Sequence, residues 1–313
     1  MNVLMSGYRG FVGTNLIEYT KNNWNITGLT RHRQENDILP KVMTWQDVSG
    51  AGLPDVSTVV HLAGKAHDMK GVSQPAAYFE ANTYLTQELF DKFLQSDARC
   101  FIYCSSVKAA ADKVDGVLTE NTDPKPQTAY GKSKQMAEAY LLQQTLPAGK
   151  SLYILRPCMI HGPGNKGNLN LLYNFVQRGI PYPLHAFENK RSFLSVNNLC
   201  YIINTMVDNA GKIPSGIYHL ADDEALSTNE LMNIMAEVTK KNIRKWNISP
   251  SLIRKVARLG DYLHLPLNSD RLQKLTESYE VSNEKIKNAL SLHHLPVTAR
   301  DGLVATIQSF QST

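Results

Sequence analysis

Tyr130 and Lys134 stand four residues apart in the segment TAYGKSK, and their types and spacing suit them to proton transfer. On a helix this spacing places both side chains on one face. An ammonium beside a phenol favours the ionised phenol, so we expect the pKa of Tyr130 to fall from its ordinary value near 10 toward working pH. The pair is therefore predicted to act as a proton relay.

A glycine-rich turn follows the first apolar segment of the chain, residues 2–6, and precedes helix-like spacing over 14–22. Glycines leave backbone amides accessible, and at a helix start such amides can bind a pyrophosphate. A tight turn without a ligand is the alternative, but the position between strand and helix favours a dinucleotide site. The residues expected to contact the cofactor here are Gly7, Gly10, Phe11, Val12 and Gly13. A dinucleotide beside a proton relay predicts hydride chemistry.

Ser105 and Ser106 directly follow the apolar segment at residues 100–104. If that segment is a strand of a doubly wound sheet, both hydroxyls emerge at the carboxyl edge, where such folds bind their ligands. We expect Ser106 to act with Tyr130 on a substrate oxygen, and Ser105 to be a second substrate contact. The alternative for these serines is to cap the next segment.

Apolar segments that alternate with amphipathic ones predict a parallel sheet covered on both faces. After about residue 160, segments rich in Gly, Pro and Asn interrupt this rhythm. We therefore predict an α/β fold with a doubly wound Rossmann-type sheet over 1–160 and a smaller substrate lobe over 161–313, some segments of which return to the large domain. Strands are expected at 2–6, 26–30, 57–62, 100–104, 151–155 and 216–220, and helices at 76–95, 196–209, 229–240, 249–263, 283–289 and 299–310.

Composition places few demands on the interpretation. The chain has 313 residues, 42% of them hydrophobic, and a formal charge of +5, which is too mild to indicate nucleic acid binding. Its four cysteines form no CxxC pair, so we expect reduced core residues and no metal site. The sequence shows no secretory signal and no run of about 18 apolar residues, which predicts a cytoplasmic protein without stable membrane insertion. The basic stretches at 240–245 and 254–258 are expected to be solvated helix faces.

The end of the predicted second strand bears on the choice of cofactor. It reads LTRHR over residues 29–33, with no acid to accept hydrogen bonds from the adenosine ribose. Arg31 and Arg33 could pair with a 2′-phosphate, which favours NADP(H) and leaves NAD(H) possible; a solvated loop is the alternative. Asp47, with Val48, is a candidate for holding the adenine amino group, although an exposed turn would look the same.

Motifs in a fixed order cover nearly the whole chain: GYRGFVG at 7–13, VVHLAG at 59–64, FEANTYLTQ at 79–87, CSSVK at 104–108, YGKSK at 130–134, LRPCMIHGPGNKGN at 155–168 and RSFLSVNNL at 191–199. With them the chain resembles the extended short-chain dehydrogenases that act on nucleotide sugars, the NAD-dependent epimerase/dehydratase family. GPGNKGN, KRSFLSVNN and ESYEVSNEKIKNAL are most similar to the branch of UDP-N-acetylhexosamine 4-epimerases and 4-reductases.

The resemblance implies roles for particular residues. Tyr130 would be the general acid or base, Lys134 its pKa tuner and a ribose ligand, and Ser106 the hydroxyl beside sugar O4. Further cofactor contacts would come from Leu62, Ala63, Gly64, Asn82 and Pro157. Substrate contacts would come from Lys65, Asn168, Arg191 and Arg271, the last three at positions that hold the nucleotide diphosphate in relatives.

The resemblance also bears on the reaction. Dehydratases of this superfamily carry an Asp-Glu pair after the strand-end hydroxyl, where this chain has Val107 and Lys108. We therefore expect an enzyme that reduces the C4 keto group of a UDP-N-acetylated hexose with NADPH. The alternatives are a UDP-hexose or UDP-hexosamine 4-epimerase with retained NAD and, more remotely, a non-catalytic NADP(H) sensor. The resemblance further implies a UDP-sugar partner, a role in polysaccharide biosynthesis and a possible homodimer.

Overall fold

A seven-stranded parallel sheet forms the centre of the larger lobe in the computed structural model, which describes residues 1–66, 74–165, 168–263 and 268–311. Its strands lie in the order β10-β7-β5-β4-β1-β2-β3. This is the arrangement of a doubly wound sheet, which confirms the predicted fold class. The strands are β1 (Asn2–Ser6), β2 (Asn25–Thr30), β3 (Lys41–Thr44), β4 (Thr58–His61), β5 (Cys100–Cys104), β7 (Ser151–Pro157) and β10 (Gly216–Leu220).

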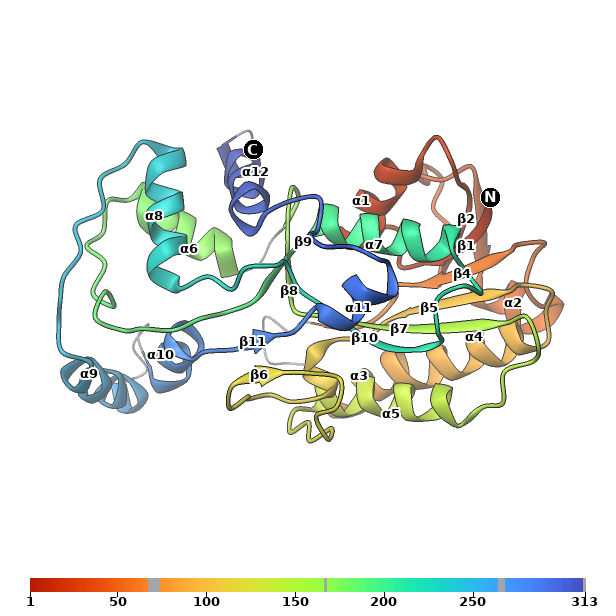
Figure 1. Ribbon diagram of the computed structural model, residues 1–313, viewed down its shortest axis with the longest axis horizontal. Helices are drawn as coiled ribbons and strands as arrows, with labels where there is room; N and C mark the ends of the chain where they lie inside the picture. Colours follow the sequence, from red (N-terminus) through yellow and green to blue (C-terminus); the bar gives the residue numbers. More distant parts are fainter. Residues whose placement is uncertain (67–73, 166–167, 264–267, 312–313) are drawn as a thin grey trace.

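Helices cover both faces of the sheet (Figure 1). Strand β1 shows why two apolar cores result: Val3 and Met5 pack into one core and Leu4 into the other, because successive side chains of a strand point to opposite faces. One face carries α1 (Phe11–Thr20) and α7 (Val196–Asp208); the other carries α2 (Trp45–Ala51), α3 (Pro75–Phe79), α4 (Leu85–Leu94) and α5 (Ala129–Gln143).

The helix predicted over 76–95 is continuous but changes its winding. A π-helical turn, Glu80–Tyr84, joins α3 to α4 and buries Asn82 and Thr83. The edge strand β3 was not predicted, because its four residues are only partly buried and give little apolar signal. The strands expected at 26–30, 57–62 and 151–155 differ from β2, β4 and β7 by one or two residues at an end.

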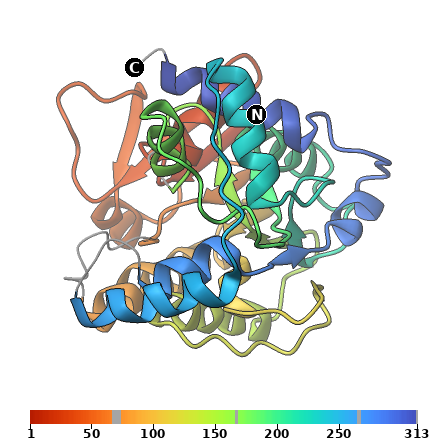
Figure 2. The same cartoon turned by 90° about the vertical axis from the view of Figure 1, so that its left-hand side faces the viewer.

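The smaller lobe has a helical core (Figures 1 and 2). Here α8 packs against α12 and α6, and α9 packs against α10. These helices are α6 (Asn168–Gln177), α8 (Thr228–Thr239), α9 (Pro250–Leu263), α10 (Ser269–Thr276) and α12 (Ala299–Gln311). Among the described helices, none is both long and apolar enough to cross a membrane.

Two short parallel pairings connect the lobes. In one, β8 (Met159–His161) pairs with β9 (Phe193–Ser195); in the other, β6 (Val117–Leu118) pairs with β11 (Glu280–Val281). The predicted domain boundary at residue 160 falls inside β8. Beyond it, α7, β10 and α11 (Glu284–Ala289) belong to the sheet lobe, since α7 packs on α1 and α11 on β10.

Candidate active site

Helix α5 brings Tyr130 and Lys134 to the carboxyl edge of the sheet. Thr128 caps its start, with the Thr128 hydroxyl accepting a hydrogen bond from the Gly131 amide at 3.1 Å. One turn later the Lys134 ammonium is almost fully buried and donates to the Cys104 carbonyl, the last residue of β5, at 2.8 Å. The predicted pair therefore lies against the end of a central strand.

Gly131 explains how Ser106 and Tyr130 come together. A Cβ atom at this position would lie 2.4 Å from the Lys108 carbonyl oxygen, so only glycine lets α5 approach the 3-10 helix Val107–Ala109 this closely. Ser106 caps that 3-10 helix, accepting from the Lys108 amide at 3.2 Å, and its hydroxyl lies close enough to the Tyr130 phenol to lower the pKa of Tyr130. Ser106 thus caps the next segment and lies beside Tyr130, and its action on a substrate oxygen stays a prediction.

The expected fall in the pKa of Tyr130 is wrong for the protein without ligands. Burial raises the pKa of Tyr130 to about 12, and the hydrogen bond from Ser106 lowers it only in part. Lys134 does not reverse this effect, because its ammonium is directed to the Cys104 carbonyl and burial lowers its own pKa to about 8. Desolvation outweighs the pairing that helical spacing alone predicts.

Glu138 extends the same helix face by one more turn and was missed by the sequence reasoning. Its carboxylate accepts two hydrogen bonds from Arg156 on β7, at 2.9 and 2.6 Å, and a third from the Ser105 hydroxyl. Ser105 is therefore used inside the large lobe, and its predicted substrate contact is not supported. The spacing Tyr130, Lys134, Glu138 was a signal that could have revealed this residue.

The glycine turn has the shape that a diphosphate requires. Gly7 has a positive φ of 71°, and a Cβ on it would lie 2.6 Å from the Ala63 amide nitrogen. A Cβ on Gly13 would lie 2.5 Å from the Gly7 carbonyl oxygen. Helix α1 then begins at Phe11, so its first amides face this turn. The cradle fits a dinucleotide pyrophosphate, with Val12 in the first turn of the helix.

The segment after β4 joins the glycine turn to the relay. A Cβ on Gly64 would lie 3.0 Å from the Lys134 ammonium nitrogen. Asn82 fixes the next residue, because its carboxamide accepts from the Lys65 amide at 2.7 Å and donates to the Lys65 carbonyl at 3.0 Å. Its amide also donates to Ser133 of α5 at 2.9 Å, so Asn82 positions this segment against the relay helix.

Leu62 and Pro157, which the resemblance implies as cofactor contacts, lie at or just beyond strand ends, and their contact with the cofactor stays a prediction. Leu62 follows β4 and its amide donates to Ser6, the last residue of β1; Pro157 ends β7. An aromatic neighbour, Tyr78 on α3, was not predicted. Its ring lies 6.3 Å from that of Tyr130 and 5.7 Å from the Lys65 ammonium. Tyr78 thus forms one wall beside the relay.

A carboxylate does lie at the end of β2, contrary to the expectation from the sequence. Asp37 folds back onto the glycine turn, where it pairs with the Arg9 guanidinium and accepts a hydrogen bond from the Tyr8 hydroxyl at 2.8 Å. Arg9 also donates to Thr30, the last residue of β2, at 3.1 Å. The Arg9 contact holds the pKa of Asp37 below its ordinary value. The loop after β2 therefore places a carboxylate, that of Asp37, beside the glycine turn.

The residues predicted to select NADP(H) or to hold adenine have other contacts. Arg33 pairs with Asp47 at 3.0 Å, and Arg31 is exposed just past β2. Asp47 caps α2, accepting from the Thr44 amide at 2.7 Å, and its contact with adenine stays a prediction. The Val48 side chain is fully buried in the core.

In the small lobe, Arg191 faces the segment that follows Ser106. Its backbone bridges to Tyr279, whose hydroxyl donates to the Ala111 carbonyl at 2.7 Å, and burial lowers the pKa of Arg191. Arg271 is exposed in the first turn of α10. Asn168 begins α6, and its side chain lies outside the described part of the chain. Arg191 is thus connected through Tyr279 to the segment that follows Ser106.

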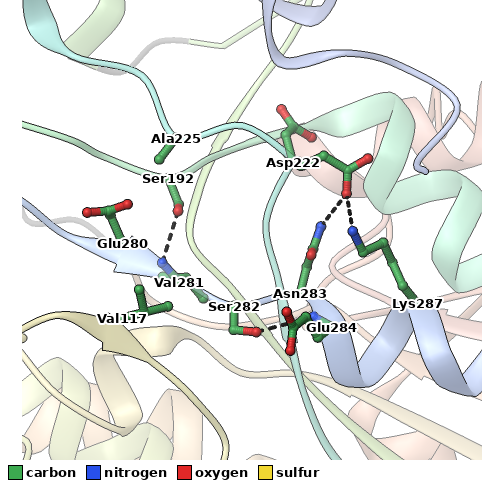
Figure 3. Close-up of a pocket in the computed structure, with 11 residues that line it drawn as sticks. Val117, Ser192, Asp222, Ala225, Glu280, Val281, Ser282, Asn283, Glu284 and Lys287 are labelled. Atoms are coloured by element: carbon green, nitrogen blue, oxygen red, sulfur yellow. Dashed lines mark hydrogen bonds and ion pairs between the residues drawn. The ribbon is translucent and has the colours of Figure 1, made fainter. Parts of the chain in front are cut away.

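A cavity of about 260 Å³ lies beside β11, separate from the relay (Figure 3). Four carboxylates line it, from Asp222, Asp223, Glu280 and Glu284. Asp222 accepts from the Ser195 amide at 3.0 Å, and Asp223 pairs with Lys287 at 2.8 Å. An acidic lining of this kind repels a diphosphate. The cavity is therefore a junction between the lobes, and the relay edge is the candidate active site. No group of metal-binding side chains occurs among the residues that the structure describes.

Comparison with known proteins shows the family of the chain. The family described as NAD dependent epimerase/dehydratase matches residues 3–221. The UDP-glucose 4-epimerase of Vibrio cholerae is 30% identical over 99% of this chain and 95% of its own length. The N-acetyl-alpha-D-glucosaminyl-diphospho-ditrans,octacis-undecaprenol 4-epimerase of Escherichia coli O157:H7 is 29% identical over 98% of this chain and 94% of its own.

Among solved structures, the UDP-N-acetylglucosamine 4-epimerase of Bacillus cereus superposes over the whole of both chains with a TM-score of 0.77 at 20% identity. At that identity the likeness concerns the fold alone. The sequence relatives named above are both 4-epimerases, so they support the epimerase alternative better than the predicted 4-keto reductase.

Proposed function

Because the chain belongs to the NAD dependent epimerase/dehydratase family, we propose that it is a 4-epimerase of a UDP-linked hexose or N-acetylhexosamine that retains NAD through its catalytic cycle. The observation that carries this proposal is the meeting of Ser106, Tyr130 and Lys134 at the sheet edge, beside a glycine cradle shaped for a diphosphate. The family and the site together make a non-catalytic sensor the weaker hypothesis.

The residues divide the work at sugar C4. Tyr130 and Ser106 would both hydrogen-bond O4, and Tyr130 would take the O4 proton and later return it. Lys134, charged below pH about 8, would stabilise the negative charge that develops on Tyr130 when its proton moves to O4. The bound nicotinamide would supply the hydride acceptor and donor. Val107 is buried and Lys108 donates to the Asp112 carbonyl at 2.9 Å, so neither offers the acid that dehydration requires.

Asp37 supports NAD over NADP. A carboxylate beside the glycine turn can accept hydrogen bonds from adenosine ribose hydroxyls. Arg9 already neutralises that carboxylate, and Arg33 pairs with Asp47, so these two arginines have carboxylate partners without a 2′-phosphate. This differs from the NADP(H) preference expected from Arg31 and Arg33.

The diphosphate end of the substrate is proposed to reach Arg191. Burial lowers the pKa of its guanidinium, and the nearby Glu277 carboxylate opposes that shift. A guanidinium can hold a diphosphate through two parallel hydrogen bonds. The names of the two relatives give different carriers of the sugar, a nucleotide for one and a polyprenol for the other. We favour UDP for this chain because the resemblance of its motifs is to enzymes of nucleotide sugars.

Proton NMR of the purified protein with UDP-glucose or UDP-N-acetylglucosamine, without added cofactor, tests the proposal. We expect the 4-epimer to accumulate. We also expect denaturation of the protein to release NAD, which mass spectrometry identifies. The Tyr130→Phe variant should bind the same NAD and lose at least a hundredfold in turnover, since it lacks only the proton-transferring oxygen. Stoichiometric consumption of added NADPH, with no epimer formed in its absence, would instead identify a reductase.

A further inference from the structure

Helix α9 exposes an apolar stripe that no described element covers. Leu252, Val256, Leu259 and Leu263 are 53%, 44%, 56% and 59% exposed. With 3.6 residues per turn, these positions fall on one side of the helix. A different stripe, Ile253, Ala257 and Gly260, packs against the rest of the lobe. The helix therefore has two apolar faces, of which folding of the described chain buries one.

The location of α9 makes this stripe accessible to a large surface. The helix lies at the end of the small lobe farthest from the sheet in Figure 1, and it runs across the face turned toward the viewer in Figure 2. The connecting segment 241–249 runs along the same end of the lobe. Two aromatic side chains add to the exposed apolar area: Tyr262 is 84% and Trp246 is 52% exposed. Aromatic residues of this kind favour the boundary between water and lipid.

Basic side chains accompany the apolar stripe. Arg254, Lys255 and Arg258 are exposed on α9, against a single acid, Asp261. At 100° per residue, Lys255 borders the stripe and Arg258 follows it around the helix. Four more exposed basic residues lie at the end of α8 and in the connecting segment: Lys240, Lys241, Arg244 and Lys245. This end of the lobe thus combines exposed apolar side chains with a local excess of positive charge.

We propose that α9 docks this protein onto an anionic lipid bilayer, lying in the headgroup region with Leu252, Val256, Leu259 and Leu263 turned toward the acyl chains. An exposed apolar stripe bordered by Lys and Arg is the pattern of interfacial helices, in which apolar burial and attraction to anionic lipid act together. The charge selects the occupant, because a neutral protein groove would leave these cations without compensation. With 14 residues α9 is too short to span, so the contact is peripheral.

Flotation with lipid vesicles tests this docking. The wild-type protein should float with vesicles of phosphatidylcholine and phosphatidylglycerol and remain at the bottom of the gradient with phosphatidylcholine alone. In the Val256→Asp/Leu259→Asp variant the fraction of protein bound to vesicles should fall at least tenfold, because the variant places two charges in the stripe. The Lys255→Glu/Arg258→Glu variant should lose a similar amount through charge reversal, and salt near 0.5 M should weaken wild-type binding.

Leu142→Asp is the matched control, since Leu142 is 51% exposed but lies on α5 in the large lobe. It should float as the wild type does. All variants should retain their melting temperature and their turnover of soluble UDP-sugar, so loss of docking is distinguishable from failure of the proposed function. The proposal is overturned if the wild type does not float with anionic vesicles, or if both double variants float to the same extent as the wild type. It is also overturned if Val256→Asp/Leu259→Asp dissociates an oligomer without lipid, which would make a second copy the occupant.

Discussion

The buried pair Glu138 and Arg156 should be the most sensitive support of the catalytic edge. Both side chains are 2% exposed, and the carboxylate also holds Ser105, the neighbour of the proposed catalytic hydroxyl. In Glu138→Ala the Arg156 guanidinium stays buried without its counter-charge. Such a change costs about 3–5 kcal/mol, because the lone charge keeps its desolvation penalty and loses its partner.

That loss can be expressed as a melting shift. For 313 residues the entropy of unfolding is about 0.7 kcal/mol per kelvin. Glu138→Ala should therefore melt about 4–7 °C below the wild type by differential scanning calorimetry. Glu138→Gln should lose less, since the amide oxygen still accepts from Arg156.

A double variant separates the pair from its surroundings. Glu138→Met/Arg156→Met removes both charges at similar volume, and it should recover most of the stability lost in either single variant. The reasoning is refuted if Glu138→Ala melts within about 1 °C of the wild type, or if the double variant loses the sum of the two single losses.

Three further changes probe the cofactor side of the site. Lys134 has a pKa of about 8 in the folded protein and 10.5 ordinarily. Between these values the unfolded chain binds more protons, so the contribution of this group to the free energy of unfolding rises with pH. Measured by urea unfolding at pH 8 and pH 10, this increase should be about 2–3 kcal/mol smaller in Lys134→Met than in the wild type. Asp37→Asn should free Arg9 for a 2′-phosphate and shift the NADPH-to-NADH affinity ratio at least tenfold in fluorescence titrations; an unchanged ratio would place the ribose elsewhere. Gly13→Ala puts a Cβ 2.5 Å from backbone of the glycine turn and should weaken NADH binding at least tenfold by calorimetry, whereas Gly50→Ala, with open space around it, should not; equal binding by both variants would contradict the cradle.

The sequence was sufficient for features that depend on local pattern. Continuous apolar strands, the glycine turn and the spacing of Tyr130 and Lys134 are encoded within a few residues of one another. Helix α5 and the close approach at Gly131 then follow, because the motif contains the glycine that the packing needs. The family resemblance is confirmed by the match over residues 3–221. The choice between reduction and epimerisation depends on cofactor contacts made by segments distant in sequence, which local patterns do not indicate.

What the sequence could not give depends on contacts between distant segments. Asp37 reaches the end of β2 only because the loop after that strand turns back to Arg9, and no periodicity marks such a return. The pKa of Tyr130 depends on burial by several elements, which overrides the helical spacing. The Glu138 and Arg156 pair joins residues 18 apart in sequence through the packing of α5 on the sheet.

The π-helical turn Glu80–Tyr84 has a consequence for how the site and the core share one helix. An extra residue in the winding offsets the side-chain phase on either side of it by roughly 100°. Before the turn, Tyr78 on α3 lies beside Tyr130 of the relay. After it, Leu89 and Phe93 on α4 pack into the core beneath the sheet. One continuous helix can therefore contact both the relay and the sheet, in directions that a uniform α-helix would not present together.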